Sequence, residues 1–65
     1  MPEYSNSQMR SIIEEYVHHP RYRVVLYLRY CDSLTYEEIG EEVGYSTQHV
    51  KDICRRYKKV LISRL

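Results

Sequence analysis

The stretch from residue 34 to residue 61, LTYEEIGEEVGYSTQHVKDICRRYKKVL, constrains the fold of this chain more than any other part of it. Gly44 divides it into two amphipathic segments, and glycine readily ends a helix because it adopts a positive φ at little steric cost. Both segments carry apolar residues at helical spacing: Ile39 and Val43 before the glycine, and Val50, Ile53, Cys54, Tyr57 and Val60 or Leu61 after it. The pattern predicts two helices joined by a tight turn.

The ends of these two helices carry favourable caps. Thr35 is a good N-cap for the first, and Glu38 three residues later can complete a capping box. Ser46 can cap the second helix, and Tyr45 places an apolar group in the turn. Gly40 stands where a side chain would block a close crossing of the second helix. Together these features predict a helix-turn-helix.

Two further helices are predicted upstream. The first has a serine at its start as a cap, either Ser5 or Ser7. Its single apolar stripe consists of Met9, Ile12, Ile13, Tyr16 and Val17. This helix should end near His18, because Pro20 pushes His19 out of the α region and itself suits the first turn of a helix.

The second upstream helix should end before Asp32 and Ser33, which break its pattern. Its predicted buried side consists of Val24, Val25, Leu28 and Tyr27 or Cys31, with Arg21 and Arg29 facing outward. No segment predicts a β-strand, an internal repeat or a second domain. We therefore expect an all-α fold, a single small four-helix domain over residues 1–65 that contains the helix-turn-helix, with residues 1–6 disordered.

At this point a family resemblance can be stated. The segment LTYEEIGEEVGYSTQHVK resembles the DNA-reading part of bacterial sigma factors, their region four, and PRYRVVLYLRY resembles the helix that precedes it. Two features differ from the family: the linker Cys31-Asp32-Ser33 is short, and the recognition helix begins Thr47-Gln48-His49 instead of with arginines. The resemblance implies a small sigma-like regulator of the phage or mobile-element type, rather than a complete sigma factor.

The charge is distributed unevenly along the chain. The net charge is only +1, but Met1 to Gly44 carries four Arg against eight Asp and Glu, a net charge of −4. From Tyr45 to Leu65 there are six Lys and Arg against one Asp, a net charge of +5. Positive charge is thus concentrated on the predicted recognition helix, as binding to phosphates requires.

The outward side chains at the start of the recognition helix are predicted to meet base edges in the major groove. Gln48 can read adenine, Lys51 can reach guanine or a phosphate, and Asp52 can accept a hydrogen bond from cytosine. By resemblance to sigma factors, the base-reading residues are Thr47, Gln48, His49, Lys51 and Asp52. The alternative is a helix-turn-helix that is purely structural or binds protein.

A second set of residues is predicted to contact the DNA backbone: Arg29, Thr35, Tyr36, Ser46, Arg55, Lys58 and Lys59. The last three lie further along the basic helix, where phosphate is the nearer target. Thr35 and Tyr36 begin a helix whose N-terminal amides could hold a phosphate, although an ordinary cap explains them equally. Arg29 lies in LRY, which matches a sigma-family element close to the DNA, but it could also be a solvated arginine paired with an acidic residue.

Other site types find little support in the sequence. The histidines and cysteines include no close Cys pair and no i, i+4 His pair, so we expect no metal site, no cofactor and no enzyme activity. The two cysteines are expected to stay reduced.

No apolar run approaches the roughly 18 residues that span a bilayer, and no secretory signal is recognisable, so we expect no membrane partner and a cytoplasmic, nucleoid-associated protein. Glu37, Glu38, Glu41 and Glu42 are expected to form a solvated face, or an acidic surface for RNA polymerase.

The function that we predict is a sequence-specific regulator of transcription that binds double-stranded DNA. One alternative is a small protein that binds RNA polymerase or a sigma factor and modulates transcription. Another is a phage accessory protein for DNA packaging or excision. The C-terminal apolar residues Val60, Leu61, Ile62 and Leu65 suggest a homodimer, unless the N-terminal helix covers them.

Overall fold

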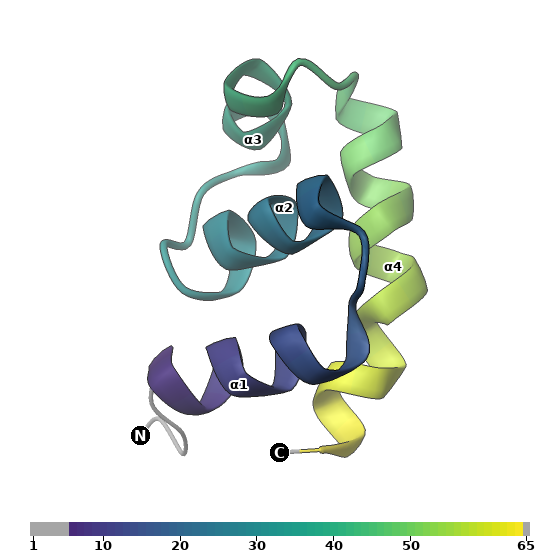
Figure 1. The fold of residues 1–65 in the computed structure, drawn as a ribbon. Coiled ribbons are helices and arrows are strands. Elements are labelled where there is room, and N and C mark those ends of the chain that lie inside the picture. The colour runs from purple at the N-terminus through teal and green to yellow at the C-terminus, as the bar shows by residue number, and fades with distance from the viewer. Residues whose placement is uncertain (1–5, 65) are drawn as a thin grey trace.

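The computed structural model describes residues 6–64, and Figure 1 shows their fold. Its helices are α1 (Asn6–Tyr16), α2 (Pro20–Tyr30), α3 (Tyr36–Val43) and α4 (Thr47–Ser63), and within residues 6–64 there is no strand. The predicted all-α, four-helix architecture is confirmed. The expected disorder over residues 1–6 is wrong at Asn6, which begins α1. Residues 1–5, including the predicted cap Ser5, and Leu65 lie outside the described residues.

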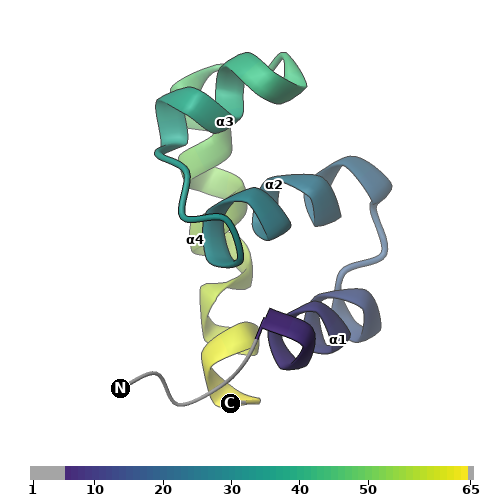
Figure 2. The ribbon, with the colours of Figure 1, turned by 90° about the vertical axis from the view of Figure 1, so that its left-hand side faces the viewer.

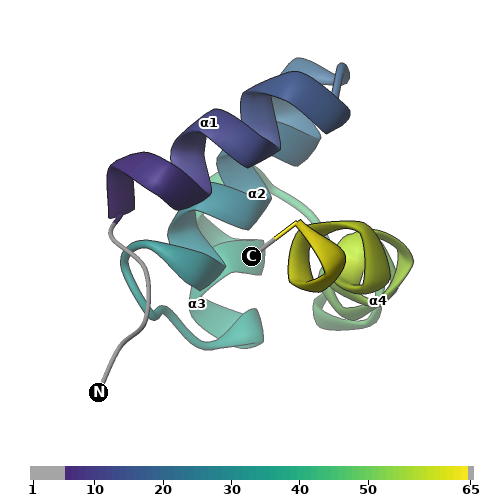
Figure 3. The same ribbon diagram turned by 90° about the horizontal axis from the view of Figure 1, so that it is seen from below.

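α4 is the long element around which the others are arranged. It packs against α3 near its N-terminal end, against α2 along its middle and against α1 near its C-terminal end (Figures 1 and 2). Seen from below, α1 crosses in front of α2 while α4 is viewed nearly end-on beside them (Figure 3). The helix-turn-helix, α3 and the first half of α4, therefore occupies one end of the molecule, with α1 at the other.

A single cluster of buried apolar side chains joins the four helices. Its members are Met9, Ile12, Ile13, Val17, Val25, Leu26, Ile39, Val50, Ile53, Cys54 and Leu61. The stripe predicted for α1 is confirmed, with Tyr16 half-buried at its edge. Fully buried side chains thus come from both halves of the helix-turn-helix and from the two upstream helices that support it.

The buried side of α2 differs from the prediction. Val25 is buried as expected, but Leu26 is also buried, Leu28 is only half-buried and Val24 is 42 % exposed. The run VVLYL places apolar residues all around a helix, where successive residues are about 100° apart. Periodicity alone therefore does not choose the buried face, and the helices packed against α2 decide it.

The connection between α1 and α2 also begins earlier than predicted. α1 ends at Tyr16 rather than near His18, and Ser7 lies inside the helix instead of capping it. His19 is the N-cap of α2, and its Nδ1 accepts a hydrogen bond from the Arg21 amide at 3.2 Å. Pro20 occupies the first turn, as predicted.

The helix-turn-helix has the predicted caps. The amide of Glu38 donates to Thr35 Oγ1 at 3.1 Å, and the amide of Thr35 donates to Glu38 Oε1 at 2.8 Å, which completes the capping box. Gly44 ends α3 with a φ of 79°, and its amide donates to the Gly40 carbonyl at 2.8 Å. Ser46 Oγ accepts from the His49 amide at 3.1 Å and so caps α4.

Gly40 is required for a slightly different reason than predicted. A Cβ atom at this position would lie 2.5 Å from the carbonyl oxygen of Tyr45. The obstacle is therefore the backbone of the turn that folds over α3, rather than the crossing helix itself.

The C-terminal apolar residues are only partly used within the chain. Leu61 is 1 % exposed and Val60 is half-buried, whereas Ile62 is 56 % exposed. α1 packs against this part of α4, as the alternative to a dimer required. Of the residues from which the homodimer was predicted, Leu61 thus lies inside the domain and Ile62 remains exposed, while Leu65 lies outside the described residues.

Candidate nucleic-acid interface

The five predicted base-reading residues all have exposed side chains on the first turns of α4: Thr47, Gln48, His49, Lys51 and Asp52. They are exposed because Val50 and Ile53 turn toward the core, and the 3.6-residue repeat directs the residues between them outward. The structure does not place them on one line, however. They divide into a central stripe and two flanks.

The central stripe consists of Gln48, Asp52 and Arg55. Gln48 Nε2 donates to Asp52 Oδ1 at 3.1 Å, and Arg55 Nη1 lies 3.7 Å from the same oxygen. Asp52 therefore already has partners on both sides along the helix. The sequence offered a signal for this arrangement, since these residues have the i, i+4 and i, i+3 spacing of helical side-chain pairs.

His49 lies on one flank, within a group of aromatic rings. Its ring centroid is 4.4 Å from that of Tyr45 and 6.3 Å from that of Tyr22, both in edge-to-face geometry. Tyr22 in turn stacks on His19, with their centroids 4.0 Å apart. The exposed His49 side chain thus also contacts the turn and the start of α2.

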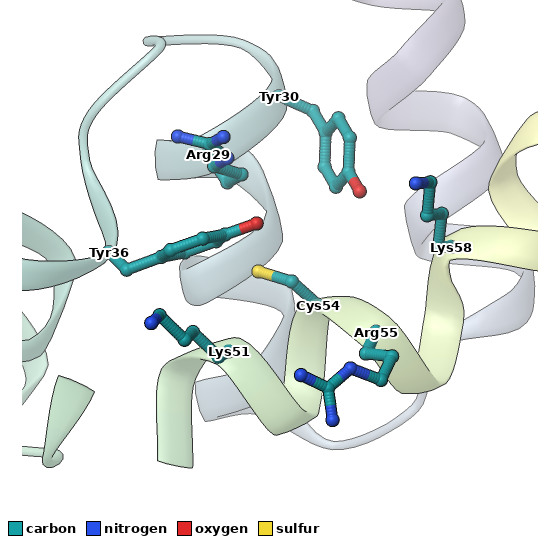
Figure 4. Close-up of a pocket in the computed structure, with 7 residues that line it drawn as sticks. All are labelled: Arg29, Tyr30, Tyr36, Lys51, Cys54, Arg55 and Lys58. Atoms are coloured by element: carbon teal, nitrogen blue, oxygen red, sulfur yellow. The ribbon is translucent and has the colours of Figure 1, made fainter. Parts of the chain in front are cut away.

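The other flank is a basic pocket of about 500 Å³ between α2, α3 and α4 (Figure 4). Its lining residues are Arg29, Tyr30, Tyr36, Lys51, Cys54, Arg55 and Lys58. Four of these carry positive charge, and none of the described residues that line the pocket is acidic. The hydroxyl groups of Tyr30 and Tyr36 both point into the space between the basic side chains (Figure 4).

Arg29 is held in the pocket by its own contacts. Its Nη1 donates to the carbonyl oxygen of Leu34 at 2.9 Å, and its guanidinium carbon lies 4.3 Å from the centre of the Tyr36 ring. The alternative of a solvated arginine paired with an acidic residue therefore does not describe it. The guanidinium is fixed in place and still has unused donors, since one of its five N–H groups goes to Leu34.

Cys54 forms the floor of the pocket. Burial raises the pKa of the Cys54 thiol above its ordinary value of 9.0, while the charge of Arg29 acts in the opposite direction. The group is therefore a neutral thiol near pH 7, and the pocket contains no thiolate that would neutralise its positive charges.

The pocket brings together four of the seven predicted backbone-contacting residues, namely Arg29, Tyr36, Arg55 and Lys58, and adds Lys51 from the base-reading set. The other three lie outside it. Thr35 and Ser46 use their side-chain oxygens as helix caps, and Lys59 is exposed further along α4. The carboxylate of Glu38 occupies the N-terminal end of α3, which disfavours a phosphate at those amides.

Sequence reasoning missed Tyr30 as a member of this site. It is the last residue of α2, one helical turn after Leu26, and its hydroxyl reaches the pocket. Adjacency to Arg29 was the available signal, but the direction of its ring depends on how α2 packs against α4.

The sequence of this helix-turn-helix matches a known protein family. The family described as Sigma-70, region 4, matches residues 19–59, which include all of α2, α3 and the turn and most of α4. The chain belongs to this family. The region 4 domain is a DNA-binding helix-turn-helix, and its family is not a family of enzymes. Comparison with curated proteins and with solved structures gave no match.

The described part of the region 4 domain lacks two other features. Within residues 6–64, no helix combines the length and the apolar character that crossing a membrane requires. The same residues contain no group of three or more His, Cys, Asp or Glu side chains arranged to hold a metal ion.

Proposed function

We propose that this domain is a sequence-specific regulator of transcription that binds double-stranded DNA, with the first turns of α4 in the major groove. The observation that carries the proposal is the basic pocket directly beside the exposed face of α4. A helix-turn-helix positions its recognition helix through contacts to the flanking phosphates and reads sequence through base edges. The domain offers both kinds of surface on adjacent sides of one helix.

The pocket supplies suitable groups for a backbone phosphate. Arg29 is pre-positioned by Leu34 and Tyr36, so little side-chain entropy would be lost when it binds an anion. Lys51, Arg55 and Lys58 add charge from α4, and the Tyr36 hydroxyl is a further donor. The hydroxyl hydrogens of Thr35 and Ser46 and the ammonium of Lys59 can contact the neighbouring phosphates.

For base reading we propose Thr47, Gln48, His49 and Lys51, with unequal roles, while Asp52 contributes through its hydrogen bond to Gln48. Gln48 has the clearest access, because it lies on the outward stripe. Lys51 lies between the stripe and the pocket, and so is placed between a base edge and a phosphate. His49 is exposed but is restrained by its aromatic neighbours.

A protein partner is the competing proposal. The exposed glutamates of α3 outside the capping box, Glu37, Glu41 and Glu42, form an acidic face that would suit a basic surface on RNA polymerase or an activator. This face supports an interactor that does not read DNA, or a regulator that uses both surfaces.

An accessory protein for phage DNA packaging or excision would use the same DNA-binding side, without acting on transcription. A DNA-binding role places the protein in the cytoplasm, at the nucleoid.

The affinity expected of a single helix-turn-helix module indicates that this domain needs a further binding partner. A single module in one major groove buries about 600–1,000 Å² of protein and seldom binds tightly alone. We propose that RNA polymerase or a second copy of this chain supplies the remainder. A second copy on a palindromic site would place the two recognition helices about 34 Å apart.

The test is a selection for bound duplexes followed by titration of the selected site and a scrambled duplex at several salt concentrations. We expect Gln48→Ala to fold normally and lose preference between the two duplexes. Lys58→Ala should weaken binding to both and reduce the salt slope by about one. Arg64→Ala removes the same charge from the far end of α4 and serves as the matched control, with little change in slope. A parent chain that binds no duplex even at low salt would overturn the proposal and favour the protein-binding alternative.

A further inference from the structure

We infer that Asp52 is a positioning residue that fixes the orientation of the Gln48 amide, so that Gln48 selects adenine over guanine. This inference rests on the DNA-reading function proposed above. It replaces the prediction from sequence, in which Asp52 accepts a hydrogen bond from cytosine directly.

The contacts of Asp52 carry the inference. Its Oδ1 atom accepts a hydrogen bond from Gln48 Nε2 at 3.1 Å and lies 3.7 Å from Arg55 Nη1. All three side chains are exposed on the outward stripe of α4, which we place against the bases. One of its two carboxylate oxygens is therefore already engaged by two neighbours on the same helix, and these contacts orient the carboxylate along the helix surface.

The consequence for base recognition follows from the chemistry of the amide. Adenine presents an acceptor at N7 and a donor at N6, so a glutamine reads it with one N–H and its carbonyl oxygen together. Guanine presents two acceptors, N7 and O6, and a carbonyl oxygen facing O6 is repelled. An amide free to rotate can turn its NH₂ group toward guanine. Asp52 holds that NH₂ group on its own side, which leaves one N–H and the carbonyl oxygen for adenine.

Arg55 offsets the electrostatic cost of placing the Asp52 carboxylate close to DNA. An unpaired aspartate close to the DNA would be repelled by the phosphates on either side of the groove. The guanidinium of Arg55, at 3.7 Å, offsets that charge, and it also faces the basic pocket that we assign to a phosphate. The stripe thus combines an amide reader, a carboxylate that orients it and a cation that neutralises the carboxylate.

The arrangement can be tested without disturbing the fold. The side chains of Arg55 and Asp52 are 73 % and 56 % exposed, and exposed pairs of this kind contribute little to stability. Substitutions at Asp52 should therefore leave thermal melting almost unchanged. A difference in DNA preference between such variants then reports on recognition.

The experiment uses the full chain and four duplexes that differ only at the base pair whose preference depends on Gln48, identified by comparing the parent with Gln48→Ala. Asp52→Ala should reduce the preference for adenine over guanine there by about tenfold, with no additional loss in a Gln48→Ala background. Asp52→Asn keeps a carbonyl acceptor and should restore most of the preference without the charge. Glu15→Ala removes one carboxylate from α1 as the charge control, and its preference should equal that of the parent.

Three outcomes would overturn the inference while leaving the DNA-binding function intact. These are an unchanged preference in Asp52→Ala, equal losses in Asp52→Ala and Asp52→Asn, and a loss at a different base pair from the one that Gln48 reads. The third outcome would instead identify Asp52 as a direct reader. A parent chain that binds no duplex, or a Gln48→Ala variant without any change in preference, would remove the inference together with its premise.

Discussion

At the scale of single residues, the two glycines of the helix-turn-helix have different physical roles. Gly44 has open space around its α-carbon but a φ of 79°, which other L-residues rarely adopt. Gly40 lies within a helix with ordinary backbone angles, and the Tyr45 carbonyl leaves no room for a Cβ atom. One position is therefore constrained by backbone conformation and the other by space.

This distinction predicts different responses to substitution. Gly44→Asn should cost less stability than Gly44→Val, because asparagine tolerates the left-handed region, where a β-branched residue loses about 1–3 kcal/mol. At Gly40 even alanine should lower the melting temperature, and asparagine should be no better, because every Cβ meets the same backbone oxygen. Thermal melts followed by circular dichroism give the order. A Gly40→Ala variant that melts like the parent would show that the turn can move aside.

The buried thiol of Cys54 predicts a loss of stability in alkali. Its pKa is raised by burial above the ordinary value of 9.0, so the unfolded chain releases this proton before the folded chain does. The contribution of Cys54 to the free energy of unfolding should therefore be constant below about pH 8 and fall as pH rises through 9.0 toward the higher folded-state pKa. Urea melts at about pH 7 and pH 10 measure the difference.

The matched variant for this experiment is Cys54→Ala, which cannot ionise. Burial also raises the pKa of Cys31 and of Tyr27, whose hydroxyl donates to Glu14, so part of the alkaline loss should persist. The expected result is a smaller decrease in unfolding free energy between the two pH values than in the parent. Equal decreases in the two proteins would mean that Cys54 is more solvated than its burial indicates.

At the scale of the elements, the capping box of α3 gives a local test of the helix-turn-helix. Thr35→Ala removes one of two reciprocal hydrogen bonds and should cost about 0.5–2 kcal/mol of stability, whereas Thr35→Ser keeps the acceptor and should cost much less. Glu38→Ala should have a smaller effect, and the double variant should lose less than the two single losses added together, because they share one motif. Chemical denaturation of all four proteins measures this coupling. Strict additivity would show that the two bonds act independently.

The elements also show which parts of the molecule were accessible from the sequence. The caps of α3 and α4, the glycine turn and most of the buried residues of α1 and α4 were predicted correctly, because each depends on residues within one or two helical turns. The cap of α1 is not among them, since Ser7 lies inside that helix and Ser5 lies outside the described residues. The buried face of α2 was predicted only in part, because its apolar residues surround the helix and only its neighbours select a side.

The candidate site shows the same division between features that the local sequence predicts and features that tertiary packing decides. Exposure of the α4 residues followed from periodicity, but the pocket depends on how Arg29 and Tyr36, from different helices, meet α4. The direction of Tyr30 and the aromatic contacts of His49 likewise depend on tertiary packing. The pairing of Gln48 with Asp52 is the exception, since its i, i+4 spacing was visible in the sequence and its meaning was not recognised.

At the scale of the whole molecule, the two ends of α4 have different tasks. Its first turns, with the pocket, carry the basic surface that we assign to DNA, and its last turns bury Leu61 in the core near α1. α1 lies outside the match to the family, which begins at residue 19, yet it supplies Met9, Ile12 and Ile13 to the single core. We therefore regard α1 as the element that closes the core beneath the helix-turn-helix.

This arrangement leads to a prediction about assembly. Among residues 6–64 the exposed large hydrophobic side chains are Val24 in α2 and Ile62 near the end of α4. A stable interface needs about 1,000 Å² or more of buried surface, which two such residues do not provide. The backbone extends over 29 × 24 × 17 Å, so two copies about 34 Å apart on DNA would touch only at their edges.

We therefore expect the free chain to sediment as a monomer at micromolar concentration, and any second copy to join on the DNA. On a duplex with two half-sites one helical turn apart, binding should be at most weakly cooperative, because the direct contact between copies is small. Ile62→Ser is the informative variant, since it removes apolar surface without opening the core. Its sedimentation and its binding curve should match those of the parent. A parent that sediments as a dimer, and becomes monomeric in Ile62→Ser, would instead place a homodimer interface at the end of α4 and restore the assembly predicted from the sequence.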